Sequence, residues 1–241
     1  MHTEDNSGKL EWQRLKTALF IPVLFVALLW AIKLGELVVG LELGVFGIYP
    51  RTAHGLIGIV TSPLIHANLQ DHLYLNSLPL IILWTGILYF YRKIAMNVFF
   101  WIYLISGIGV WIFARNAYHI GASGLIYGLV AFIFFSGIIR KNASLLALSL
   151  FVTFIYGGLI WGVLPSDPTV SWEAHLFGAI AGIICAFYYR KMGPQRQRYQ
   201  WEFEDDDDDD INLDELEKPQ EGKIKIRYLY KREDGKQDNL N

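Results

Sequence analysis

The sequence predicts an all-α polytopic membrane protein in which six transmembrane helices form one bundle. The chain has 241 residues, of which 53% are hydrophobic and 15% are aromatic. The apolar residues lie in six runs of about twenty residues, the length that an α-helix needs to cross a hydrocarbon core of roughly 30 Å. Most charged residues lie outside these runs, in the amino-terminal segment, short connections and a polar tail. Helices satisfy their own backbone hydrogen bonds where water is absent, so this pattern disfavours a large soluble helical domain.

The first apolar run covers residues 17–34 and follows a polar segment, residues 1–16. Only Pro22 and Lys33 interrupt this run. No small-residue cleavage site follows it, and further apolar runs come later, so we expect a retained first span rather than a signal peptide. The remaining predicted spans cover residues 73–91, 98–114, 121–139, 143–164 and 172–189.

Basic residues predict the orientation of the bundle. They are concentrated in the amino-terminal segment, in the connections that carry Arg92 and Arg140, and in a cluster that begins at Arg190. Segments rich in Lys and Arg stay in the cytoplasm, so we expect both termini there. The second, fourth and sixth spans would then enter from the outer face. We expect the protein in a bacterial inner membrane.

Composition divides the chain into three parts. These are a cytoplasmic amino-terminal segment (1–16), a six-span domain (17–190) and an acidic cytoplasmic tail (191–241) that we expect to be disordered. Residues 205–210 are consecutive aspartates, and a run of like charge is typical of a solvated linker rather than a metal site. No nucleic-acid motif is present, and no cofactor is expected. The sequence does not indicate an oligomeric state.

Unusual polar residues fall at one depth of the predicted bundle. His72 and Asn76 open the second span, Ser123 opens the fourth, and His175 opens the sixth. Polar residues in membrane spans are costly and usually face a bundle interior or a watery cavity, so their common depth indicates one site. His72 and Asn76, four residues apart, share a helical face, as do Ser123 and Tyr127.

Glycines provide the close contact that such a site would need. They are Gly121, Gly124 and Gly128 on the fourth predicted span, and Gly178 and Gly182 on the sixth. Pairs of small residues four apart let helices approach closely, so Ser123 Oγ could reach the His175 ring. A serine hydroxyl is a weak nucleophile at neutral pH, and an imidazole can accept its proton. This pair is therefore a candidate nucleophile and base.

Each of these residues also has a simpler interpretation. A serine among glycines is common where membrane helices pack, and a single His175 or Asn76 could serve packing or interhelical hydrogen bonding. His66 and His119 are expected to stabilise loops. A zinc site built from histidines is the rival chemistry, but the sequence contains no His-Glu-x-x-His motif or comparable cluster, so no metal is expected.

Together, the motifs resemble the rhomboid family of intramembrane serine proteases. They are Gly121-x-Ser123-Gly124 with Tyr127, Ala174-His175-x-x-Gly178-x-x-x-Gly182, and His72-x-x-x-Asn76. The resemblance covers about residues 15–190, and Tyr49-Pro50-Arg51 resembles the arginine motif of the family's first loop. It implies a rhomboid-like bundle with a long, partly membrane-embedded first loop, here residues 35–71. One departure is that five residues separate His66 from His72, where the family pattern has four.

The resemblance implies a serine endopeptidase, a hydrolase acting in or near transmembrane segments of membrane protein substrates within the lipid bilayer. Ser123 would attack the scissile carbonyl and His175 would transfer the proton, with Tyr127 packed beneath the imidazole. His72, Asn76 and the Ser123 N–H would stabilise the oxyanion. The alternative is a non-catalytic rhomboid-like protein that binds transmembrane clients, for which loss of the serine or histidine is expected.

Overall fold

The computed structural model describes residues 2–155, 161–165 and 167–193, and within these ranges the regular secondary structure is helical. The all-α prediction is therefore confirmed. Most of the predicted tail, residues 194–241, lies outside the described ranges. The helices are α1 (His2–Val39), α2 (Gly58–Thr61), α3 (Leu75–Phe90), α4 (Ala95–Phe113), α5 (Ser123–Ile139), α6 (Ala143–Ile155) and α7 (Trp172–Tyr188).

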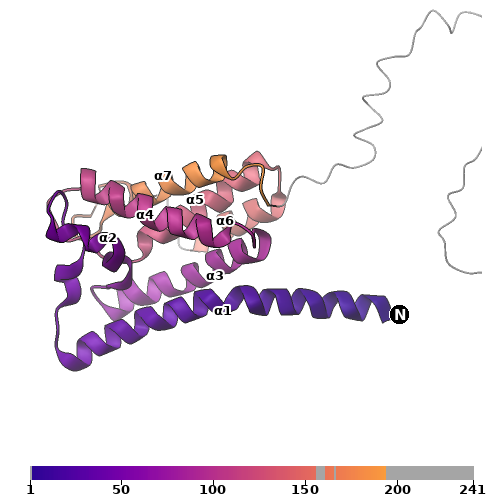
Figure 1. The fold of residues 1–241 in the computed structure, drawn as a ribbon, viewed down its shortest axis with the longest axis horizontal. Helices are drawn as coiled ribbons and strands as arrows, with labels where there is room; N and C mark the ends of the chain where they lie inside the picture. The colour runs from indigo at the N-terminus through magenta and orange to yellow at the C-terminus, as the bar shows by residue number, and fades with distance from the viewer. Residues whose placement is uncertain (1, 156–160, 166, 194–241) are drawn as a thin grey trace, which may run out of the picture. The chain divides into compact units, whose positions relative to one another are not determined.

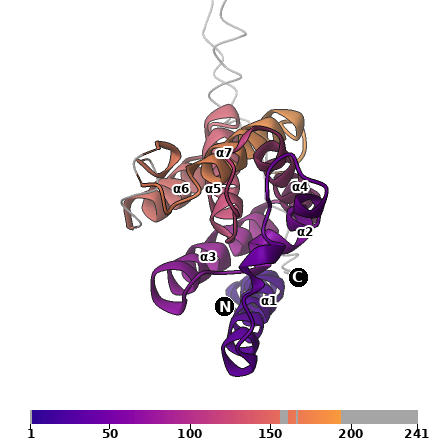
Figure 2. The same cartoon turned by 90° about the vertical axis from the view of Figure 1, so that its left-hand side faces the viewer.

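Helix α5 is the centre of the bundle. It packs most extensively against α7 and also contacts α3, α4 and α6, whereas α1 lies at the edge and packs mainly against α3 (Figures 1 and 2). Leu129, Phe132 and Ile133 of α5 are fully buried. A helix that is apolar on all sides needs such a central position. The first residue of α5, Ser123, is thus held at one end of the bundle.

Helices α5 and α7 approach each other through the predicted glycine pairs. A Cβ atom added at Gly178 would lie 2.0 Å from the Gly124 carbonyl oxygen, and one added at Gly182 would lie 2.1 Å from that of Gly128. Neither position could hold a larger residue without moving a backbone. Small residues therefore set the separation of the two helices, and with it the distance between their first turns.

The helix ends differ from the predictions in two places. Helix α1 starts before residue 17, because the polar segment continues the helix, with Arg14 paired to Glu11 at 3.0 Å. It ends at Val39, and Gly40, which has a left-handed φ of 71°, follows directly. The fifth span was expected to reach residue 164, but Trp161–Val163 form a 3-10 turn. Pro165 disfavours a helical conformation at residue 164.

The number of spans remains a prediction. Among the described residues, three helices are long and apolar enough to cross a membrane: Gly8–Val39, His72–Phe90 and Ala95–Phe113. The other apolar helices are shorter, namely His54–Leu64, Ser123–Ile139, Ala143–Phe154 and Trp172–Tyr188.

The long first loop contains short helical turns and contacts the end of α4. Arg51 Nη1 donates to the carbonyl oxygens of Ile112 (3.1 Å) and Ala114 (2.8 Å), and its Nη2 donates to Asn116 Oδ1 at 2.5 Å. A guanidinium is favourable at the carbonyl end of a helix. Large apolar side chains of this loop, Val45 and Phe46 among them, are exposed. This is the surface that a loop in contact with lipid would need.

Candidate active site

Ser123 and His175 lie in direct contact. Ser123 begins α5 and His175 lies in the first turn of α7. The distance from His175 Nε2 to Ser123 Oγ is 2.8 Å. The other ring nitrogen, Nδ1, lies 2.7 Å from the carbonyl oxygen of Gly162, in the 3-10 turn that precedes α7. His175 therefore bridges a hydroxyl and a backbone carbonyl.

These two contacts determine the tautomer of a neutral His175. A carbonyl oxygen can only accept a hydrogen bond, so Nδ1 must carry the proton. Nε2 then has a free lone pair and accepts the hydroxyl hydrogen of Ser123. This is the arrangement that a histidine base needs toward a serine nucleophile, with a third group orienting the ring. Here the third group is the main chain of Gly162.

Tyr127 stacks on the imidazole of His175. The ring centroids are 4.1 Å apart and the planes differ by 9°. Gly162 completes this packing, because a Cβ atom there would lie 1.9 Å from the Tyr127 hydroxyl oxygen and 3.1 Å from His175 Nδ1. Only glycine fits at this position of the turn. The His175 ring is therefore held by Tyr127 on its face and by the Gly162 main chain at Nδ1.

A cavity of about 630 Å³ opens in front of the serine, and the predicted residues His72, Asn76, Ser123, Tyr127 and His175 all line it. Asn76 is buried, and its Nδ2 has no hydrogen-bond partner in the described part of the chain. The N–H of Ser123 belongs to the first turn of α5, where no carbonyl of the same helix is available. Both donors belong to residues that line the cavity.

His72 provides a third donor to the cavity. The Ala67 N–H donates to His72 Nδ1 at 3.2 Å. A neutral His72 therefore carries its proton on Nε2. That nitrogen lies against Gly121, where a Cβ atom would approach it to 2.3 Å. Gly121 has a φ of 109°. Its role differs from the expected helix packing, since it forms the turn before α5 and leaves room for the His72 ring.

A π-turn contains His72, at the place where the spacing from His66 departs from the family pattern. Residues Leu69–Tyr74 form a π-helix, with Leu73 N–H bonded to Asn68 O at 3.2 Å. A π-turn contains one residue more than the corresponding α-helical turn. The His66 and His72 rings lie edge to face, with centroids 5.0 Å apart.

His66 supports the turn that presents the serine. Its Nε2 accepts the Ala122 N–H at 3.3 Å, directly before Ser123. Burial, followed by the nearby His72, lowers the pKa of His66 to about 3. The ring is therefore neutral near pH 7, as an accepting nitrogen requires. This agrees with the loop-stabilising role expected for His66.

Comparison with known proteins identifies the fold family. The family model described as "Rhomboid domain" matches residues 53–192, which is more than half of the chain. The chain belongs to the rhomboid family. The expected resemblance is thereby confirmed.

Three mycobacterial proteins similar to this rhomboid bear names that state no activity. Uncharacterized proteins of Mycobacterium bovis (Mb1372) and Mycobacterium tuberculosis (Rv1337) are each 36% identical over an alignment of 186 positions, which covers 72% of this chain and 75% of theirs. An uncharacterized protein of Mycobacterium leprae (ML1171) is 33% identical over 187 residues, covering 72% of this chain and 71% of its own. No solved structure matches the rhomboid significantly.

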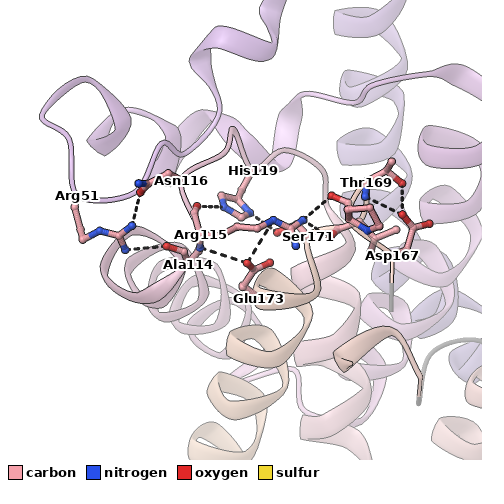
Figure 3. A network of polar contacts seen from close by, with 11 residues as sticks. Arg51, Ala114, Arg115, Asn116, His119, Asp167, Thr169, Ser171 and Glu173 are labelled. Carbon is pink, nitrogen blue, oxygen red and sulfur yellow. Dashed lines mark hydrogen bonds and ion pairs between the residues drawn. The ribbon is translucent and has the colours of Figure 1, made fainter. Parts of the chain in front are cut away.

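A polar network holds the loop beside the site (Figure 3). Arg115 Nη2 donates to the carbonyl oxygens of Pro168 (2.9 Å) and Val170 (2.7 Å). His119 Nδ1 lies 2.6 Å from Ser171 Oγ, and its Nε2 lies 3.0 Å from the Arg115 carbonyl oxygen. Burial lowers the pKa of His119, so its ring accepts from Ser171 in the neutral form. The network fixes the loop that leads into α7 and His175.

Glu173 belongs to this network and not to the His175 contacts. Its Oε1 accepts the Arg115 N–H at 3.3 Å and lies 3.7 Å from Arg115 Nε. We therefore expect Glu173→Gln to keep kcat within about threefold of the parent, a barrier change below about 1 kcal/mol. The check is turnover of a transmembrane substrate, with Asp167→Asn as the matched carboxylate control. A 100-fold loss specific to Glu173→Gln would instead make this carboxylate a catalytic partner.

Sequence reasoning missed two parts of the site. The carbonyl of Gly162 has no signal in the sequence, because every residue carries one. Arg115 belongs to none of the sequence motifs, although its contacts with Pro168 and Val170 hold the neighbouring loop. Within the described residues, no group of three His, Cys, Asp or Glu side chains is arranged to hold a metal ion.

Proposed function

We propose that this rhomboid is an intramembrane serine endopeptidase that uses Ser123 and His175 to hydrolyse a peptide bond in or near a transmembrane segment. The observation that carries the proposal is the 2.8 Å contact between Ser123 Oγ and His175 Nε2, with the opposite nitrogen bonded to Gly162 O. A serine that served only helix packing would need neither the lone pair of His175 Nε2 beside its hydroxyl nor Tyr127 stacked on the imidazole.

Acylation begins when Ser123 Oγ attacks the scissile carbonyl carbon and His175 Nε2 takes the hydroxyl proton. The protonated ring keeps its Nδ1–H bond to the Gly162 carbonyl. As the tetrahedral intermediate collapses, the C–N bond breaks and Nε2 returns the proton to the leaving amine. Water then enters the cavity, loses a proton to Nε2 and hydrolyses the ester. Ser123 is regenerated with its hydroxyl proton.

Three donors would stabilise the oxyanion: the Nε2–H of His72, the Nδ2–H of Asn76 and the N–H of Ser123. All three residues line the cavity that contains the serine hydroxyl. A preorganised donor in a water-poor site contributes on the order of 3 to 4 kcal/mol to transition-state stabilisation. Together they can supply transition-state stabilisation to a catalytic pair that has no acidic third residue.

The substrate would be a membrane protein whose scissile bond reaches the cavity in an extended form. The lipid bilayer is the second partner, because the exposed surface of the bundle is strongly apolar. The positive-inside pattern supports a site that opens toward the outer face, with both termini cytoplasmic.

A fluorophosphonate probe tests this function directly. The purified wild type should become labelled on Ser123, because such probes react with a serine that has an adjacent base. Ser123→Ala should abolish labelling. Ser136→Ala, on the same helix and remote from the cavity lining, should leave it unchanged. A folded wild type that is not labelled but still retains transmembrane proteins would favour the client-binding alternative.

A further inference from the structure

Lys33 is a buried charge that the catalytic steps above do not use. It interrupts the first apolar run, and in α1 it is only 6% exposed. Its Nζ lies 2.8 Å from Glu36 Oε2 and 3.0 Å from the carbonyl oxygen of Ala67. Burying an ion pair among apolar helices is costly. We therefore expect a specific role for the Lys33–Glu36 ion pair.

The ion pair holds the segment that contacts His72. Ala67 accepts from Lys33 through its carbonyl and donates to His72 Nδ1 through its N–H. Both peptide groups that flank the Ala67 Cα are thus fixed. Glu36 is fixed in turn, because its Oε1 accepts the Leu43 N–H at 3.0 Å. A continuous chain of hydrogen bonds runs from the start of the first loop to the His72 ring.

This chain determines which nitrogen of His72 is a donor. While the Ala67 N–H points at Nδ1, a neutral ring places its proton on Nε2, beside Gly121. If the Ala67 N–H turned away from the ring, the ring proton of His72 would be free to move from Nε2 to Nδ1. Nε2 would then present a lone pair to the cavity, and a lone pair repels an oxyanion.

We propose that Lys33, held by Glu36, is a positioning residue that keeps His72 in its Nε2–H tautomer through the Ala67 peptide. The inference rests on the proposed function, because it assigns Lys33 a part in stabilising the oxyanion. Lys33 is not among the residues that line the cavity, so it acts through His72 and not on the substrate.

The test replaces the pair together. The double variant Lys33→Met/Glu36→Gln removes the ammonium without leaving a carboxylate unpaired in the bundle. Loss of an oxyanion donor costs about 10² to 10³ in kcat, so weaker positioning should cost roughly 10-fold to 100-fold. KM should change by less than about twofold, since substrate contacts are retained. Lys33→Arg should recover most of kcat, and Lys16→Met, on an exposed part of the same helix, should resemble the parent.

A second measurement needs no catalytic activity. In protein labelled with ¹⁵N-histidine, the His72 signals should show a protonated Nε2 and an unprotonated Nδ1. The double variant should show a mixture of tautomers. If it does not fold, Glu36→Gln alone should shift the mixture in the same direction. A tautomer shift in a protein that the fluorophosphonate probe never labels would remove the proposed function and leave the positioning role intact.

Two results would overturn the inference. One is an unchanged His72 tautomer with unchanged kcat in the double variant. The other is a fall in kcat that follows a lowered Tm, without a tautomer shift or recovery in Lys33→Arg. Either would reduce Lys33 to a structural ion pair.

Discussion

Cleavage of a transmembrane substrate is expected to fall by at least about 10⁴-fold when Ser123 is replaced by Ala or His175 by Asn. Ser123→Ala removes the nucleophile. His175→Asn leaves a side chain that cannot accept the hydroxyl proton. The two residues act as one unit, so the double variant should be no slower than either single variant. The measurement is the initial rate of product formation in proteoliposomes.

The control for this prediction is His54→Asn, a histidine substitution in the first loop away from the cavity lining. It should match the parent, and all variants should keep the parent Tm within a few degrees. Ser123→Ala protein that cleaves at more than about 1% of the parent rate would exclude Ser123 as the nucleophile.

Gly178→Ala is expected to have the largest effect on the fold. The added Cβ would lie 2.0 Å from the Gly124 carbonyl oxygen, which is main chain and cannot rotate away. Helices α5 and α7 must separate, at a cost of roughly 2 to 3 kcal/mol or more. For a chain of this size, this corresponds to a Tm lowered by about 5 to 10 °C. Probe labelling should fall as well, because the separation also moves Ser123 from His175.

Gly35→Ala is the matched control, since a Cβ atom there has no heavy atom within 4 Å. It should not lower Tm, because Ala is a better helix former than Gly, and it should leave probe labelling unchanged. If Gly178→Ala unfolded at the parent Tm, the close contact between α5 and α7 could not be what fixes the geometry of the site.

Much of the bundle could be predicted because long apolar runs indicate helices that lie in an apolar environment. The predicted span 98–114 corresponds to α4 and 121–139 to α5. The site residues stood out because polar groups in such runs are costly, and Ser123 and His175 do lie in contact. Helix ends were predicted less well, because they depend on caps and turns rather than on hydropathy. The polar first residues of α1 are the clearest example.

The remaining features depend on geometry that single residues do not encode. The spacing of His66 and His72 departs from the family pattern, and it does not predict the π-turn or the contact between the two rings. The sequence shows Lys33 as a charge in an apolar run. It does not show the contact with Ala67, because the two residues lie far apart along the chain.

The main-chain contact of His175 affects how this protein must be studied. Because the group that orients the ring is the carbonyl of Gly162, no side-chain substitution removes it selectively. A systematic alanine scan would therefore report a steric effect at this position and not the contribution of the hydrogen bond. Gly162→Ala would not delete the hydrogen bond but would push a methyl group into the Tyr127 hydroxyl. Only a change in the path of the main chain between α6 and α7 can weaken this contact.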